Sequence, residues 1–149
     1  MPDLYVTRAV PNPAGKDRSS RGATNDQLNG EWVEFLNTTQ GTLSLEGVAL
    51  VHQTFNQYCQ RTGSGIVTTF SNSLGSGKSV RVHTGSGTGV WEGNVFHLFL
   101  GRGNYVWNNA CGDSVILQNQ NGLIDWAAYD SNPPEGKILV RVGGQNRLA

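Results

Sequence analysis

Residues 30–37, GEWVEFLN, have the alternating pattern of a β-strand bounded by residues that form turns. Residues 107–117, WNNACGDSVIL, follow a similar pattern later in the chain and continue to residues 122–126, GLIDW. Neither stretch contains a nucleophile with its base, a phosphate-binding loop or a spaced set of metal ligands. The two stretches therefore indicate the fold much better than they indicate an activity.

Apolar and polar residues alternate along most of the chain, and no window of helical length shows a stripe with the helical period. In residues 79–83, for example, Val80 and Val82 share one face. Asn121 and Gly122, between two later strands, are a signal for a type I′ hairpin. Short strands with evenly spaced turns predict an all-β, antiparallel β-sandwich, with a barrel as the alternative.

The sequence predicts one domain over residues 1–149, with a core at about 4–142 and a long polar loop at 11–30. A chain of this length buries about two-thirds of its unfolded surface. We interpret Trp107 and Trp126, like Trp32, as structural because large aromatic side chains dominate β cores. The predicted core contacts come from Trp32, Val33 or Phe35, Val80, Val82, Leu98, Leu117 and Ile124.

The charges balance, with eleven Lys plus Arg against eleven Asp plus Glu. Proteins that bind nucleic acid usually carry a basic excess, so specific nucleic-acid binding is not expected. Any DNA contact should be weak, run through Lys16, Arg18 and Arg21, and fade steeply with salt. No apolar run approaches the ~18 residues of a membrane span. The N-terminus lacks the features of an export signal, so cytoplasmic location is expected if Met1 is the native start.

Cys59 and Cys111 both lie in turn-rich surroundings. Two cysteines are too few for a disulfide framework, and nothing in the sequence marks an oxidising compartment. We therefore expect two free thiols, with a bridge in an exported protein as the alternative. No basic neighbour would lower the pKa of either thiol, so neither is predicted to be a nucleophile.

Two short motifs resemble catalytic loops without meeting their requirements. Residues 75–79, GSGKS, look like a phosphate-binding loop, but Asn72 stands where the first glycine is required and a strand follows. Residues 112–114, GDS, are similar to the nucleophile block of one esterase family, but Ser114 begins an alternating strand. Asp113 is interpreted as a turn residue that binds nearby backbone amides.

The histidines, His52, His83 and His97, lie within strand patterns without an acidic partner at fixed spacing. Under the usual geometric requirements for a site, this arrangement does not favour catalysis. The sequence predicts no catalytic, cofactor-binding or metal-binding residues, no cofactor, and no turnover on nucleic acid, ester, peptide or glycoside.

The polar loop contains the chain's spare oxygen ligands. Asp17, Asn25, Asp26 and Glu31 could surround a hard cation such as calcium. Their spacing matches no known calcium loop, and basic residues interrupt them. A solvated loop is the preferred interpretation.

Four segments occur along the chain in a characteristic order: residues 29–37 (NGEWVEFLN), 45–50 (LEGVAL), 77–82 (GKSVRV) and 107–117, continuing to Gly122 and Asp125. In this order they resemble the lamin-tail domain family in its stand-alone prokaryotic form. The resemblance covers about Leu4 to Tyr129 and implies an immunoglobulin-like antiparallel sandwich. In such a sandwich, the carboxylates of Glu31 and Glu34 would face solvent or cap a loop.

The resemblance implies a non-enzymatic interaction or structural module that binds a protein or surface partner, without identifying the partner or the oligomeric state. Prokaryotic members of the family often accompany nuclease or hydrolase domains. One alternative is therefore an accessory domain of a nuclease or other hydrolase system, with Asp125 and Asp130 as exposed acids. The other is a structural domain that self-associates through a sheet edge, with Arg8, Arg81 and Arg141 as charged guards of such edges.

Overall fold

The computed structural model describes residues 1–16 and 22–149. Strands dominate these residues, as the alternating pattern predicts. The elements in chain order are β1 (Leu4–Val10), α1 (Asn25–Gly30), β2 (Trp32–Asn37), β3 (Leu43–Ser44), β4 (Ala49–Phe55), β5 (Arg61–Thr69), β6 (Ser73–Leu74), β7 (Ser79–His83), β8 (Val90–Glu92), β9 (Val95–Phe99), β10 (Asp113–Asn119), β11 (Gly122–Tyr129) and β12 (Leu139–Val140).

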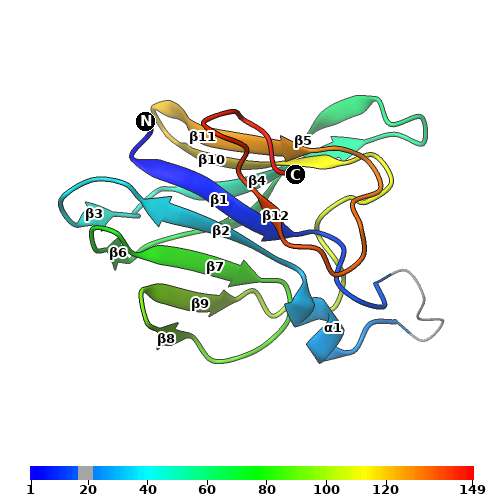
Figure 1. Ribbon diagram of the computed structural model, residues 1–149, viewed down its shortest axis with the longest axis horizontal. Helices are drawn as coiled ribbons and strands as arrows, with labels where there is room; N and C mark the ends of the chain where they lie inside the picture. The colour runs from blue at the N-terminus through cyan, green and yellow to red at the C-terminus, as the bar shows by residue number, and fades with distance from the viewer. Residues whose placement is uncertain (17–21) are drawn as a thin grey trace.

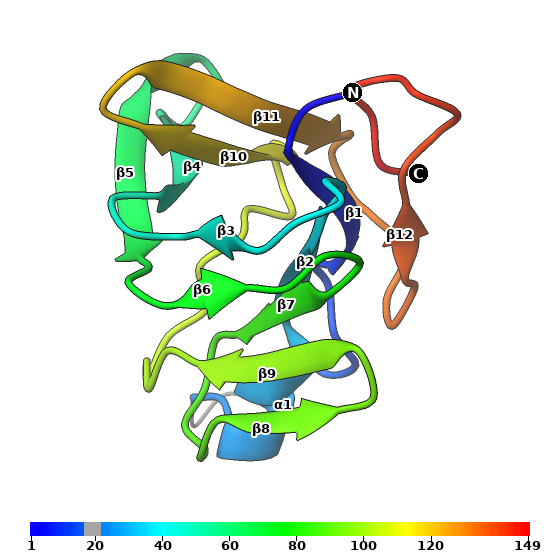
Figure 2. The ribbon, with the colours of Figure 1, turned by 90° about the vertical axis from the view of Figure 1, so that its left-hand side faces the viewer.

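Two sheets form the two layers of the molecule (Figures 1 and 2). In the described part of the chain, the six-stranded sheet has the order β12-β1-β2-β7-β9-β8 and the four-stranded sheet the order β11-β10-β4-β5. β3 and β6 form a small pair that lies between the layers in Figure 2. Paired strands here are antiparallel except β7 and β9, because the chain builds β8 at the sheet edge and returns as β9 between β8 and β7. The predicted β-sandwich is confirmed, with this parallel pair as the departure from it.

The hydrophobic core lies between the two sheets and matches the predicted inward faces. Both Val33 and Phe35 are buried in it, and the Phe35 ring packs edge-on against Phe70 at a centroid distance of 5.2 Å. Leu98 and Ile124 are only partly buried at the margin of the core. The other predicted core residues that the structure buries between the sheets are Val80, Val82 and Leu117.

The tryptophans named above occupy different environments. Trp107 is buried in the core. Trp32 is buried on the outer face of the six-stranded sheet, where the Arg81 guanidinium lies 4.0 Å from its ring centroid. Trp126 is 38% exposed, so it lies outside the buried core, and its interpretation as structural stays a prediction. Its neighbours Asp125 and Ala127 take the inward positions of β11, so the two-residue period of a strand turns Trp126 outward.

Part of the predicted polar loop is helical. Thr24 caps α1 by accepting a hydrogen bond from the Gln27 amide, and the Gln27 side chain accepts one from the Thr24 amide in return. Six residues are too few to show a helical stripe, so the sequence pattern did not reveal this helix. No helix in the described part of the chain is long and apolar enough to cross a membrane.

The predicted hairpin joins β10 and β11, but its turn type differs from the prediction. The two-residue loop is Gln120 and Asn121, because Asn119 pairs with Gly122. A type I′ turn needs positive φ at both loop residues, and Asn121 does not have one. The Asn119 side chain instead accepts a hydrogen bond from the Asn121 amide at 2.9 Å.

Cys59 and Cys111 form a disulfide, so the expected free thiols are wrong. Cys59 lies in the loop between β4 and β5, and Cys111 lies just before β10. β4 pairs antiparallel with both β5 and β10, which places the end of β4 beside the start of β10. Strand pairing over a long sequence separation therefore brings the two cysteines together.

Candidate functional site

Glu31 is fully buried where the polar loop meets the sandwich. One carboxylate oxygen accepts hydrogen bonds from the Thr84 hydroxyl at 2.7 Å and the Val106 amide at 2.8 Å. The other lies 2.6 Å from the Lys16 ammonium, which also donates to the Pro11 carbonyl. Burial raises the pKa of Glu31, and the adjacent Lys16 charge opposes that rise. Glu31 therefore caps a loop, as one of the two expected roles requires, and does not face solvent.

This cluster engages Glu31 and Lys16, which the calcium hypothesis and the DNA hypothesis for the polar loop each used. Lys16 is buried in the ion pair, so it is not available to bind DNA at the surface. Asn25 binds the backbone of Ser86, and Asp26 lies in the first turn of α1. Asp17, Arg18 and Arg21 lie outside the described residues. Within the described ranges, no group of three or more His, Cys, Asp or Glu is placed to hold a metal ion.

The strand arginines neutralise buried carboxylates and do not guard sheet edges. Arg8 and Arg81 flank the buried Glu34 at 2.9 Å each. Their strands, β1 and β7, have neighbours on both sides, so neither is an edge. Glu34 is thus buried and paired with two arginines. It neither faces solvent nor caps a loop, which were the two roles expected of it.

Asp125 is buried, which contradicts its interpretation as an exposed acid. It accepts hydrogen bonds from the Val6 amide at 2.8 Å and from the Arg141 guanidinium at 2.9 Å. Arg141 follows β12, so its ion pair with Asp125 connects the last strand to the four-stranded sheet. Arg141 therefore does not guard a sheet edge either. Asp130 is exposed and pairs with Arg147 at the surface.

Asp113 binds backbone amides, as predicted, but across strands as well as within its own turn. Its carboxylate accepts hydrogen bonds from Gln53 at 2.9 Å, Ser114 at 2.8 Å and Asn108 at 3.2 Å. Burial raises the pKa of Asp113, and the three amides oppose the rise. Ser114 itself is buried within β10, which does not suit a nucleophile.

The turn at residues 75–79 is a connection between strands. Lys78 donates a hydrogen bond to Asn94 at 2.7 Å, and β7 begins at Ser79. The segment does not open a helix, so it lacks the geometry of a phosphate-binding loop.

Two of the histidines contact each other across β7 and β9, which sequence reasoning missed. His83 Nδ1 lies 2.8 Å from the Asn29 carbonyl, so it donates there, and His83 Nε2 lies 2.8 Å from His97 Nδ1. His97 Nε2 lies 3.4 Å from the Glu92 carboxylate. The His83 ring also stacks on Phe99 at 4.7 Å. Burial lowers the pKa of His83, and the charges of His97 and Arg81 act in the same direction.

The lowered pKa of His83 predicts a loss of stability in mild acid. The unfolded imidazole, with a pKa of about 6.5, takes up a proton more readily than the folded one, so acid favours the unfolded state. We expect the free energy of unfolding to fall as the pH drops from 7.5 to 5.5, and to fall less in His83→Asn. Urea unfolding at both pH values measures this difference, and parallel pH profiles for the two proteins would contradict it.

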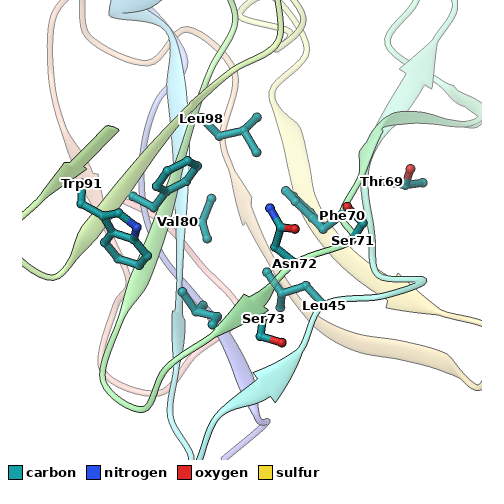
Figure 3. Close-up of a pocket in the computed structure, with 11 residues that line it drawn as sticks. Leu45, Thr69, Phe70, Ser71, Asn72, Ser73, Val80, Trp91 and Leu98 are labelled. Carbon is teal, nitrogen blue, oxygen red and sulfur yellow. The ribbon is translucent and has the colours of Figure 1, made fainter. Parts of the chain in front are cut away.

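The strongest candidate for a binding site is an apolar cleft beside β8 (Figure 3), here called the β8 cleft. Its volume is about 210 Å³. Figure 3 shows the Asn72 amide directed into the space between Val80 and Phe70. The cleft is lined by Leu45, Thr69, Phe70, Ser71, Asn72, Ser73, Leu74, Val80, Trp91, Phe96 and Leu98.

Trp91 stands at the cleft with half of its surface exposed and packs against Phe96 at a centroid distance of 5.3 Å. The glycine-rich loop before β8 permits this arrangement, because a Cβ at Gly89 would lie 2.7 Å from the Phe96 ring. The residues of β8 are exposed, and the described part of the chain supplies no strand beyond its outer side. The cleft therefore adjoins an open sheet edge.

The model of the Lamin Tail Domain family matches residues 2–131 of the chain. The chain belongs to the lamin-tail domain family. This result confirms the resemblance and the immunoglobulin-like sandwich, and the family is one of structural and interaction modules. None of the curated proteins compared with this lamin-tail domain matches it.

The fold of this lamin-tail domain extends beyond the matched residues. β12 lies after residue 131, yet it pairs with β1, and Arg141 binds Asp125 of β11. The β8 cleft lies wholly within the matched range. Alternation along β9 places Phe96 and Leu98 on one strand face, but nothing in the sequence pattern shows that residues 69–74 would form the opposite wall.

Proposed function

We propose that this lamin-tail domain is a non-enzymatic interaction module that binds a protein partner at the β8 cleft. The main support for this proposal is the cleft itself, which is an apolar space with an exposed tryptophan beside an open strand edge. An extended peptide that pairs with β8 would satisfy the free backbone groups of that edge. One of its side chains would then enter the cleft.

The size of the cleft favours a side chain of a protein over a separate small molecule. Pockets for drug-sized ligands usually measure about 300–1,000 Å³, whereas this cleft measures about 210 Å³. A protein interface needs only one or a few well-packed anchors, often aromatic, surrounded by weaker contacts. The apolar lining and the Asn72 amide suit an aromatic or aliphatic anchor next to a peptide backbone.

A selection from displayed random peptides tests this proposal. We expect peptides with an aromatic or aliphatic anchor in an extended segment, and we expect Trp91→Ala to weaken their binding at least ~10-fold, or about 1.4 kcal/mol. Fluorescence anisotropy with labelled peptides gives the dissociation constants. Trp126→Ala is the matched control, because Trp126 is exposed on the other sheet. Selected peptides that bind W91A and the unmodified protein equally well would place the site elsewhere.

Self-association is the second candidate, and the open β8 edge favours it. Two copies could pair through β8 and bury Val90 and Trp91, which are 54% and 50% exposed. Sedimentation equilibrium separates the two functions. A dimer that W91A dissociates supports self-association, whereas a monomer that binds peptide supports recognition of a separate protein.

A further inference from the structure

The outer face of the four-stranded sheet carries an apolar row that crosses all four strands. Trp126 pairs with Ile116, Ile116 with Val51, and Val51 with Ile66. We call these residues the Trp126 row. Trp126 and Ile66 are 38% and 61% exposed at the two ends of the row, Ile116 is partly exposed, and Val51 between Ile116 and Ile66 is buried. The row spans three strand spacings, or about 14 Å.

Polar side chains flank the Trp126 row on both sides. Because side chains two residues apart share a strand face, Gln53 and Ser114 lie on one side of the row and Gln118 lies on the other. These residues, with Arg61 and Ser64, line a shallow hollow of about 370 Å³.

Three polar side chains of this hollow are available to a ligand. No side chain of Gln53, Arg61 or Gln118 forms a hydrogen bond or ion pair with another residue in the described ranges. The amides offer donors and acceptors, and Arg61 offers donors only. Arg61 is the charged residue among those that line the hollow, and no Asp or Glu is among them.

We propose that this face binds an oligosaccharide along the Trp126 row. A pyranose ring has an apolar C–H face, which packs on an exposed indole, and a rim of hydroxyls, which needs both donors and acceptors. The apolar row with amides on both sides presents that combination over a length suited to a short sugar chain. Arg61 would bind a hydroxyl, or the carboxylate of an acidic sugar.

The disulfide is a second observation that agrees with a saccharide ligand. Disulfides persist mainly in proteins of oxidising compartments, such as the cell surface, where polysaccharides are abundant. The bridge joins the β4–β5 loop to the residues before β10, so it fixes one end of the sheet that carries the row. The hollow shares no lining residue with the β8 cleft, so saccharide binding here is independent of peptide binding there.

Affinity electrophoresis tests the proposal with gels that contain neutral β-glucan, xylan, galactomannan, pectate or heparin. We expect at least one polysaccharide to retard the protein, and W126A to weaken that retardation at least tenfold. Ile138→Ala is the control, because Ile138 is 46% exposed and lines neither the hollow nor the β8 cleft, so this variant should be retarded like the unmodified protein. Trp126→Phe keeps an aromatic side chain at this position and should retain part of the binding. This variant distinguishes loss of the aromatic contact from a folding defect in W126A.

Titration calorimetry with oligosaccharides of the retarding polymer then gives the affinity and the preferred length. Gln118→Ala should weaken binding, because the hydroxyls of the sugar lose the Gln118 side-chain amide as a hydrogen-bond partner. Three results would overturn the proposal: no retardation by any polymer, retardation that W126A leaves unchanged, or a dimer in solution that W126A dissociates. If W126A leaves the retardation unchanged, while Arg61→Ala or high salt abolishes it, the protein binds anionic polymers by charge attraction alone.

Discussion

Glu31→Gln is expected to lower the free energy of unfolding by about 3–5 kcal/mol, because it leaves the buried Lys16 ammonium without a counter-charge. Glu31 and Lys16 are both buried, and 2.6 Å separates their charged atoms. The pair also joins the polar loop to β2 and to the backbone of Val106 and Trp107. Urea unfolding monitored by tryptophan fluorescence gives the change.

Asp130→Asn is the matched control for this prediction. Asp130 and Arg147 form a similar ion pair at 3.1 Å, but both side chains are largely exposed to solvent. Exposed pairs contribute about 1 kcal/mol or less, so D130N should change stability little. Lys16→Met combined with Glu31→Gln should cost less than the sum of the single changes, since the uncompensated charge is then absent. If E31Q is no more destabilising than D130N, the pair does not hold the loop.

Removal of the Cys59–Cys111 disulfide is expected to lower the free energy of unfolding by about 4 kcal/mol. The bridge spans a sequence separation of 52 residues. A cross-link over that separation lowers the conformational entropy of the unfolded chain, and the chain-entropy relation converts this loss to about 4 kcal/mol of stability. The double variant Cys59→Ala/Cys111→Ala, unfolded in urea beside the oxidised protein, measures the effect.

The reduced form of the unmodified protein is the control, and its stability should approach that of the double variant. Thiol titration of the denatured, unreduced protein should find no reactive group. Two reactive thiols in that titration would contradict the bridge and restore the sequence-based expectation. They would also remove the argument that the disulfide lends to saccharide binding.

The local pattern carried enough information for the strands and most of the core. Val80 and Val82 alternate with polar neighbours, and a strand turns successive side chains to opposite faces, so their inward position follows from sequence alone. Trp126 shows the limit of residue type as a guide. The same alternation places it outside, and only the assumption that a large aromatic residue belongs in the core placed it inside.

The candidate sites depend on contacts that no local pattern encodes. Phe96 and Leu98 predict one apolar strand face, but the β8 cleft also needs residues 69–74 as its opposite wall. The four residues of the Trp126 row come from four strands, and strand order brings them into line. The polar environment of that row follows from the same register.

The amino-acid sequence by itself determined the class of fold, the inward faces of the strands and the family, because two-residue alternation and family motifs are properties of short segments. The tertiary structure decided the pairing of Cys59 with Cys111, the burial of Glu31 against Lys16, and the contact of His83 with His97. Each of these contacts joins segments that strand order or loop packing brings together. Burial and partner choice depend on that packing, and these two properties set the charge, reactivity and binding role of each side chain.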